Sequence, residues 1–193
     1  MDTHQKPKHF LDINEFDLTT LRSILDKAVE LKRIGRGHIK PLIDYSLVLI
    51  FEKSSTRTRV SFEVGMKQLG GNVIILGHKD SQLGRGETIA DTARVLSRFA
   101  DAIMIRTGSH QNLQSLADYS NVPVINGLTD YSHPCQILAD IMTLEEKFPN
   151  VNKLNLCWVG DGNNVCNSWI HLTKHYNFNP PIWVDCIKNS RLS

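Results

Sequence analysis

Apolar runs alternate with helical patterns along most of the chain. Continuous apolar runs are typical of strands that are buried on both faces of a parallel sheet, and they occur at Leu47–Phe51, Asn72–Leu76, Asp101–Ile105 and Val122–Ile125. Around them, apolar residues recur every three or four positions and predict helices that cover residues 18–34, 60–69, 87–99, 112–119 and 134–144. This alternation predicts an α/β fold, an open parallel sheet with helices on both faces.

The pattern restarts after a stretch that predicts a linker, Phe148–Lys153, which carries Pro149 and Asn150. A further strand is expected at Leu154–Val159, then a glycine-rich loop, a helix at Val165–His175 and the beginning of one more strand at Ile182–Val184. We therefore expect two units. Residues 1–149 form the first, and residues 150–193 form the incomplete start of a second α/β domain.

Composition and charge exclude several classes of protein. The 193 residues are 41% hydrophobic and 22% charged, which is typical of a globular protein. A net charge of +2, with arginines spread along the chain, argues against a nucleic-acid-binding protein. No apolar run approaches the roughly 18 residues of a membrane span, and the N-terminus resembles neither a signal peptide nor a presequence. The 4 cysteines form no C-x-x-C pair, so we expect reduced thiols and a cytoplasmic protein.

The segment Ser54–Arg59, with the sequence Ser-Ser-Thr-Arg-Thr-Arg, separates the first buried strand from the next helix. The first N–H groups of a helix lack internal partners, and the helix dipole adds positive potential there. Guanidinium groups supply paired donors that match phosphate oxygens. The segment therefore predicts an anion-binding site. The alternative is an ordinary surface helix with a Ser or Thr cap and solvated arginines.

Polar residues also follow two other strands of the predicted sheet. Arg106 follows the third strand, and the segment His133–Gln136 follows the fourth. In an open parallel sheet, ligands bind beyond the carboxyl ends of the strands, so these groups and Ser55–Thr58 are expected at one rim. Together they suit a small phosphorylated molecule with a carbonyl group to polarise.

Several motifs occur in order at consistent distances: Ser55–Arg59 followed by Ser61–Glu63, then Gly86–Thr88, Arg106 and His133–Gln136. This set resembles the carbamoyltransferases, over about residues 9–178. The segments Asn126–Thr129 and Gly160–Asn164 resemble the ornithine enzymes of that family rather than the aspartate enzymes. The resemblance implies transfer of the carbamoyl group of carbamoyl phosphate to the δ-amine of L-ornithine, which gives L-citrulline and phosphate. It also implies a homotrimer with sites at the subunit interfaces, and no metal or organic cofactor.

The resemblance further implies a role for individual residues. Four of them are expected to hold the phosphate: Ser55, Thr56, Arg57 and Thr58. Arg106 is expected to bridge the phosphate and the carbonyl oxygen, His133 to donate to that oxygen, and Gln136 to hold the carbamoyl amide. Arg106, Thr58 and His133 form the expected catalytic oxyanion site. Gln82 is expected to reach a neighbouring subunit's site, and Asn164 to contact ornithine.

Alternatives remain for some of these residues. Cys135 could act as a nucleophile, although no orienting base is evident. His171 and His175 could form a metal pair, but an exposed helix face is the preferred interpretation. Arg59 could form a structural salt bridge instead of binding phosphate.

Two alternatives concern the whole chain. Carbamoyltransferase chains continue well beyond this one, so it could be a truncated, non-catalytic remnant that at most binds carbamoyl phosphate. A weaker alternative is an aspartate carbamoyltransferase.

Overall fold

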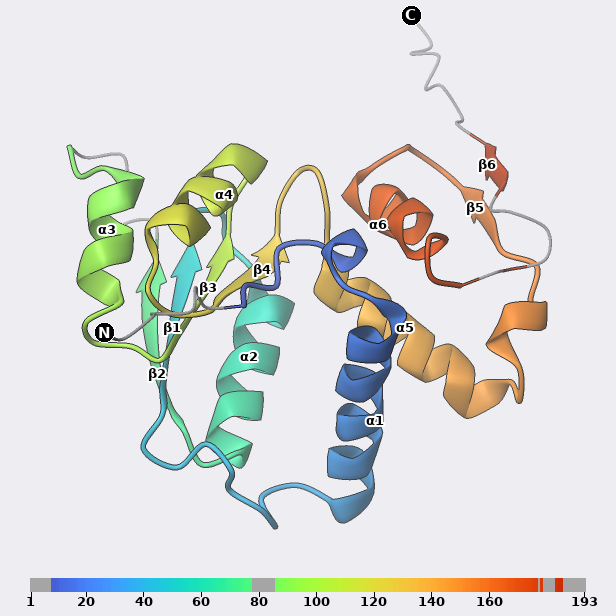
Figure 1. Cartoon of the computed structure of the whole chain (residues 1–193), viewed down its shortest axis with the longest axis horizontal. Coiled ribbons are helices and arrows are strands. Elements are labelled where there is room, and N and C mark those ends of the chain that lie inside the picture. The colour runs from blue at the N-terminus through green and yellow to red at the C-terminus, as the bar shows by residue number, and fades with distance from the viewer. Residues whose placement is uncertain (1–7, 78–85, 177, 179–182, 186–193) are drawn as a thin grey trace, which may run out of the picture.

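A four-stranded parallel sheet, in the order β2-β1-β3-β4, is the centre of the first unit (Figure 1). The computed structural model describes residues 8–77, 86–176, 178 and 183–185. The strands are β1 (Ser46–Phe51), β2 (Asn72–Gly77), β3 (Ala102–Arg106) and β4 (Val124–Leu128). The expected α/β fold with a parallel sheet is therefore confirmed, and all the carboxyl ends of these strands lie at one rim.

Helices cover both faces of this sheet (Figure 1). The helices α3 (Ile89–Leu96) and α4 (His110–Tyr119) pack on one face, against Val48, Ile50, Ile103 and Ile105. The helix α2 (Thr56–Gln68) packs on the other, where Met66 meets Leu47, Leu49, Phe51 and Met104. Successive residues of a strand point to opposite faces, so β1 is apolar from Leu47 to Phe51 because both of its faces are covered.

A third apolar cluster lies beside the sheet and joins the beginning of the chain to its later helices. It contains the short 3-10 helix η1 (Ile13–Glu15) and the helices α1 (Leu18–Ile34), α5 (Pro134–Lys147) and α6 (Asn164–Leu172). Asp17 caps α1 because its carboxylate accepts the backbone N–H of Thr20 at 2.6 Å. Figure 1 shows α6 beyond α5, on the side away from the sheet. This cluster thus fixes α6 next to the beginning of α5.

A second, smaller sheet contains β5 (Cys157–Val159) and β6 (Trp183–Asp185), which pair in parallel. The expected linker contains the 3-10 helix η2 (Val151–Lys153). The strand expected at Leu154–Val159 is shorter than the apolar pattern suggested, since only its last three residues pair with another strand. No helix in the described ranges is long and apolar enough to cross a membrane.

Two element boundaries differ from the sequence prediction at the rim. The helix α2 begins at Thr56, so Thr56–Arg59 form its first turn instead of a preceding loop. The strand β4 continues to Leu128, beyond the strand expected at Val122–Ile125, because the added residues stay paired with β3 across an irregularity at Ile105 and Arg106. Both differences bring polar residues onto regular elements at the carboxyl ends of the strands.

Candidate functional site

A cleft of about 800 Å³ opens at the carboxyl ends of β1, β3 and β4. Its lining comes from five parts of the chain: the start of α2, the end of β3, the end of β4, the start of α5, and the β5–α6 region. The residues that line it and carry polar groups include Ser54, Ser55, Thr56, Arg57, Thr58, Ser61, Arg106, His133, Gln136 and Asp140. The cleft therefore lies where ligands are expected to bind in an open parallel sheet.

The N-terminus of α2 faces this cleft without a side-chain cap. Ser55 occupies the N-cap position in an extended conformation, yet its hydroxyl makes no capping hydrogen bond. The helix has no acidic residue in its first turn, and Arg57 lines the cleft there. A cation in the first turn opposes the helix dipole unless an anion is bound nearby. This helix end is thus suited to an anion.

Arg106 and Thr58 meet at the floor of the cleft, although 48 residues separate them in the sequence. Arg106 Nη1 donates to Thr58 Oγ1 at 2.9 Å, which places the guanidinium beside the first turn of α2. Arg106 Nε is buried and has no hydrogen-bond partner among the described residues. Burial and the nearby charge of Arg57 lower the pKa of Arg106. An anion between the two guanidiniums would relieve this repulsion.

His133 is the N-cap residue of α5 and lines the same cleft as Arg106 and Leu128. Its backbone N–H donates to the Oγ of buried Ser168 at 2.7 Å, which ties it to α6. Burial, and then the charge of Arg106, lower the pKa of His133 from 6.5 to about 4. The imidazole is therefore neutral at pH 7 and can donate one N–H without adding charge.

The charges of the cleft favour an anionic ligand with a polar uncharged part. Arg57 and Arg106 form no ion pair within the described part of the chain, and Asp140 is the one carboxylate among the described lining residues. That carboxylate is engaged by Gln136, whose Nε2 donates to Asp140 Oδ1 at 2.8 Å. Two uncompensated guanidiniums and an uncapped helix N-terminus can hold a phosphate.

The structure brings most of the expected site residues together. The cleft contains Ser55, Thr56, Arg57, Thr58, Arg106, His133 and Gln136. Asn164 does not line it, and its Nδ2 donates to the carbonyl of Thr129 at 2.7 Å. Gln82 lies outside the described residues. The expected convergence at the rim is thus present for the residues after β1, β3 and β4.

The structure bears on the alternative roles considered for Cys135 and His171. Burial raises the pKa of the Cys135 thiol to about 12, which argues against a nucleophile, and its Sγ donates to the carbonyl of Asn126 at 3.4 Å. The exposed face expected for His171 is wrong: His171 is largely buried because η1 packs on α6, and its Nδ1 lies 3.0 Å from Asp12 Oδ2. The described residues contain no group of side chains suited to a metal ion.

Arg59 lies outside the cleft, although only one residue separates it from Arg57. It lines a different depression, with Phe51, Glu52 and Ile75. The structural salt bridge considered for it is not present among the residues that the structure describes. Its charge nevertheless helps Lys67 to lower the pKa of Glu63. The two arginines of the motif therefore differ in position, which the sequence alone left open.

Sequence reasoning missed several residues that shape the site. Asp140, Trp158 and Trp169 line the cleft, and Ser168 holds the backbone of His133. For Asp140 a signal existed, because Gln136 and Asp140 are four residues apart in a predicted helix and therefore share a face. For Trp158, Trp169 and Ser168 no local signal existed, because their positions depend on how the second unit packs on the first.

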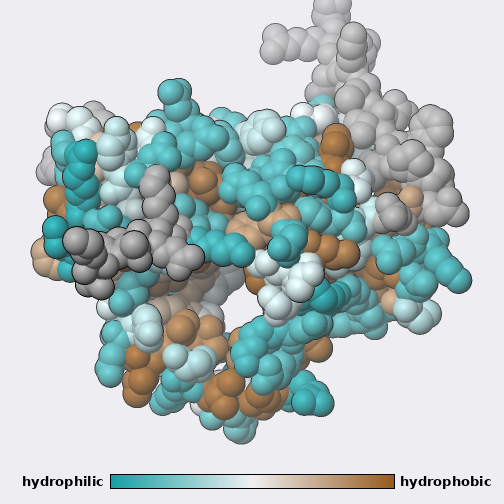
Figure 2. Space-filling model, in the orientation of Figure 1, coloured by the Kyte–Doolittle hydropathy of each residue, from teal (hydrophilic) through white to brown (hydrophobic). Residues whose placement is uncertain are grey.

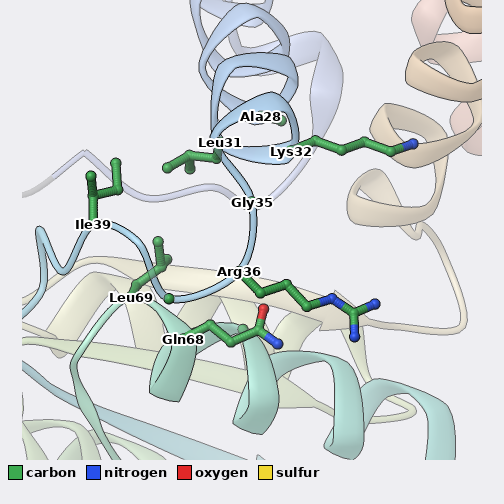
Figure 3. Close-up of a pocket in the computed structure, with 10 residues that line it drawn as sticks. Ala28, Leu31, Lys32, Gly35, Arg36, Ile39, Gln68 and Leu69 are labelled. Carbon is green, nitrogen blue, oxygen red and sulfur yellow. The ribbon is translucent and has the colours of Figure 1, made fainter.

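A second depression, of about 390 Å³, lies between the ends of α1 and α2 (Figure 3). Its lining is mostly apolar, with Leu31, Ile39 and Leu69, and the apolar atoms at that end of the molecule are visible at the bottom of Figure 2. Lys32 at its edge forms an ion pair with Glu146. Lys32, Arg36 and Gln68 also line this depression, but the cleft adds the uncapped N-terminus of α2 and a row of hydroxyl groups to its two arginines, so the cleft is the candidate site.

Comparison with known proteins agrees with this geometry. The family model described as "Aspartate/ornithine carbamoyltransferase, carbamoyl-P binding domain" matches residues 8–146. The chain is similar to the ornithine carbamoyltransferase of Methanoculleus marisnigri, with 59% identity over 163 residues, 83% of this chain and 52% of that protein. It is also similar to the ornithine carbamoyltransferase of Ruegeria pomeroyi, with 52% identity over 177 residues, 88% of this chain and 58% of that protein.

Solved structures give the same result. The ornithine carbamoyltransferase of Pyrococcus furiosus superposes with a TM-score of 0.87 at 45% identity, over 94% of this chain and 58% of that one. The enzyme of Thermus thermophilus superposes with a TM-score of 0.88 at 38% identity, over 96% and 63% of the respective chains. The chain spans a little over half the length of the curated relatives it matches, from 52% to 58%.

Proposed function

The chain belongs to the aspartate/ornithine carbamoyltransferase family, and from this premise we propose that its cleft binds carbamoyl phosphate. We further propose that the protein transfers the carbamoyl group to the δ-amine of L-ornithine, with L-citrulline and phosphate as products. The observation that carries the proposal is the pair of cations, Arg57 and Arg106, which form no ion pair with any described residue and lie beside the uncapped N-terminus of α2 in the matched domain.

The proposed binding mode follows the donors of the cleft. The phosphate occupies the N-terminus of α2, where Arg57 and the hydroxyls of Ser55, Thr56 and Thr58 surround it. Arg106, held by Thr58, reaches both the phosphate and the carbonyl oxygen. His133 donates its imidazole N–H to the same carbonyl oxygen, and Gln136 contacts the carbamoyl nitrogen.

The proposed reaction needs stabilisation of charge at two places. The neutral amine attacks the carbonyl carbon, a C–N bond forms, and negative charge develops on the carbonyl oxygen. Arg106, Thr58 and His133 surround that oxygen with preorganised donors in a partly buried site. The C–O bond to the phosphate then breaks, and the departing anion is stabilised by Arg57 and the α2 N-terminus, while the amine loses a proton.

Partners and location belong to the same proposal. Ornithine as the acceptor is supported by the relatives named above, and we propose a contact of Asn164 with it and an assembly of three copies with Gln82 at the interface. Residues 1–149 are the proposed carbamoyl-phosphate unit, and residues 150–193 belong to the proposed ornithine unit. The cytosol is the proposed location, because Cys135 and Cys157 carry free thiols.

Calorimetry with carbamoyl phosphate tests the binding site, using two arginines of the same helical turn. Charge-assisted hydrogen bonds contribute about 1.5–3 kcal/mol, so Arg57→Ala should weaken binding by about 10- to 100-fold. Arg59→Ala is the matched control and should leave the affinity unchanged, because Arg59 lines another depression. Equal losses in the two variants would refute the placement of the phosphate.

An assay of product formation tests the proposed acceptor. The purified protein is incubated with carbamoyl phosphate and either ornithine or aspartate. Citrulline from ornithine alone supports the proposal, whereas carbamoyl-aspartate would assign the chain to the aspartate enzymes. Carbamoyl phosphate binding without product from either acceptor would limit the function to binding.

A further inference from the structure

Gln136 and Asp140 form a hydrogen-bonded pair on the cleft side of α5. Gln136 Nε2 donates to Asp140 Oδ1 at 2.8 Å, and both residues line the cleft. Residues four positions apart lie on the same face of a helix, so the pair belongs to one turn of α5. Asp140 forms no ion pair within the described ranges, so the amide N–H of Gln136 is its partner there.

The chemistry of the two groups determines which end of the amide is used. An ionised carboxylate can only accept hydrogen bonds, so Gln136 must turn its NH2 group towards Asp140. The carbonyl oxygen of Gln136, Oε1, then remains available as an acceptor, since the bond to Asp140 is the one hydrogen bond that the Gln136 side chain makes among the described residues. Partial burial raises the pKa of Asp140 above its ordinary value, and the hydrogen bond from Gln136 opposes this rise because it stabilises the ionised carboxylate.

We propose that Asp140 is a positioning residue that orients the Gln136 amide so that Oε1 accepts an N–H of the bound substrate, and that this orientation selects a carbamoyl group over an acetyl group. The inference rests on the proposed function. An acyl group that carries NH2 satisfies Oε1, whereas a methyl group of the same size leaves that acceptor desolvated and unpaired. A site built to hydrogen-bond a substrate N–H rejects the analogue that lacks it.

A merely structural role for Asp140 predicts something different. A Gln–Asp pair at this spacing stabilises a helix by a small amount, and losing it affects every ligand of the cleft equally. The ratio of affinities for two ligands that differ only in the NH2 group therefore separates the two roles.

The test compares two non-hydrolysable phosphonates. Phosphonoacetamide carries an NH2 group on its carbonyl carbon, and phosphonoacetone carries a CH3 group at the same position. Calorimetry should show that the unaltered protein binds phosphonoacetamide more tightly by about tenfold, the order expected for one hydrogen bond. In Asp140→Asn the side chain is isosteric but can donate as well as accept, so the Gln136 amide can turn. Its preference should fall to about twofold or less, while the affinity for phosphonoacetone stays unchanged.

Two further variants complete the experiment. Asp140→Glu keeps an acceptor within reach of Gln136 and should retain the preference, and it replaces Asp140→Asn if that variant fails to fold. Glu146→Gln removes one negative charge from an exposed position of the same helix and should leave both affinities unchanged.

The outcomes separate the inference from the proposed function. If the unaltered protein binds neither phosphonate, the proposed carbamoyl phosphate site is wrong. If it binds both equally, the Gln136 amide selects neither group, so the inference is overturned while the site stands. If it discriminates and Asp140→Asn discriminates equally, or loses affinity for both ligands in parallel, the role of Asp140 is overturned and the site stands. Loss of the preference in Asp140→Glu would likewise overturn it.

Discussion

Replacement of Ser168 by alanine tests whether α6 positions the beginning of α5. Ser168 is fully buried, and its Oγ accepts the backbone N–H of His133 at 2.7 Å while donating to the carbonyl of Asn164 at 2.9 Å. In Ser168→Ala the volume of the side chain changes little, but the N–H of His133 loses its acceptor. The variant therefore isolates one hydrogen bond between segments that are 35 residues apart.

The expected cost follows from the burial of this bond. Leaving a buried backbone donor unpaired costs about 1–3 kcal/mol. Loss of the bond to the Asn164 carbonyl adds little, because that carbonyl can still accept a bond within the helix. Two neighbouring bonds limit the displacement, since Asn164 donates to Thr129 at 2.7 Å and Asn167 to Tyr131 at 3.1 Å. We therefore expect destabilisation of about 1–3 kcal/mol without unfolding of α6.

Urea unfolding followed by tryptophan fluorescence measures this cost. Trp158 and Trp169 both line the cleft and report on its environment. Ser23→Ala is the matched control, because Ser23 is an exposed helical serine whose Oγ donates to Thr20 at 2.8 Å within its own helix. That control should change the free energy of unfolding by less than about 0.5 kcal/mol.

Ligand binding gives the second measurement for the same variant. Because His133 begins α5 and contributes to the cleft, Ser168→Ala should weaken carbamoyl phosphate binding by several-fold, whereas Ser23→Ala should not. A free energy of unfolding equal to that of the control would refute the argument from the buried donor. Destabilisation with unchanged affinity would show that the bond supports the fold but does not position His133.

The remaining predictions concern two titratable groups of the cleft. Arg106→Gln should raise the pKa of His133 from about 4, measured by NMR titration, because one of the two causes of its lowering is removed, and an unchanged pKa would contradict the assigned contact. The pKa of His133 is about 4 in the folded protein and 6.5 in the unfolded chain, so the unfolded chain binds more protons between these two pH values. The stability that the neutral His133 imidazole contributes is therefore present above pH 6.5 and is lost as the pH falls towards 4. Iodoacetamide at pH 8 should modify exposed Cys157 well before Cys135, whose pKa of about 12 keeps it protonated; mass spectrometry of the peptides measures both, and equal rates would contradict the burial of Cys135.

Local pattern was sufficient for most of the architecture. The run Leu47–Phe51 is apolar at every position because helices cover both faces of β1. A strand that is buried on both faces can therefore be recognised from its sequence alone. The rule for strand ends placed Arg57, Arg106 and His133 at one rim, where the cleft contains them. Boundaries were less accurate where pairing decides them, as for β4, which continues through Asn126–Leu128 because β3 supplies partners.

Specific contacts within the site needed the tertiary structure. Arg57 and Arg59 look alike in the sequence, but the pitch of α2 directs one into the cleft and the other to a separate depression. His171 was expected on an exposed face, and the packing of η1 on α6 buried it beside Asp12. The sequence shows only which side chains a helix carries, and the docking of its neighbours decides which of them reach water.

By itself, the sequence determined the α/β class, the parallel sheet and the polar residues that follow its strands, because periodicity records which faces are buried. Only the tertiary structure decided that Arg106 reaches Thr58, that Ser168 holds His133 and that the Gln136 amide turns to Asp140. The first two contacts join residues 48 and 35 positions apart. They depend on the angle and depth at which helices dock on the sheet, and no local pattern records these quantities.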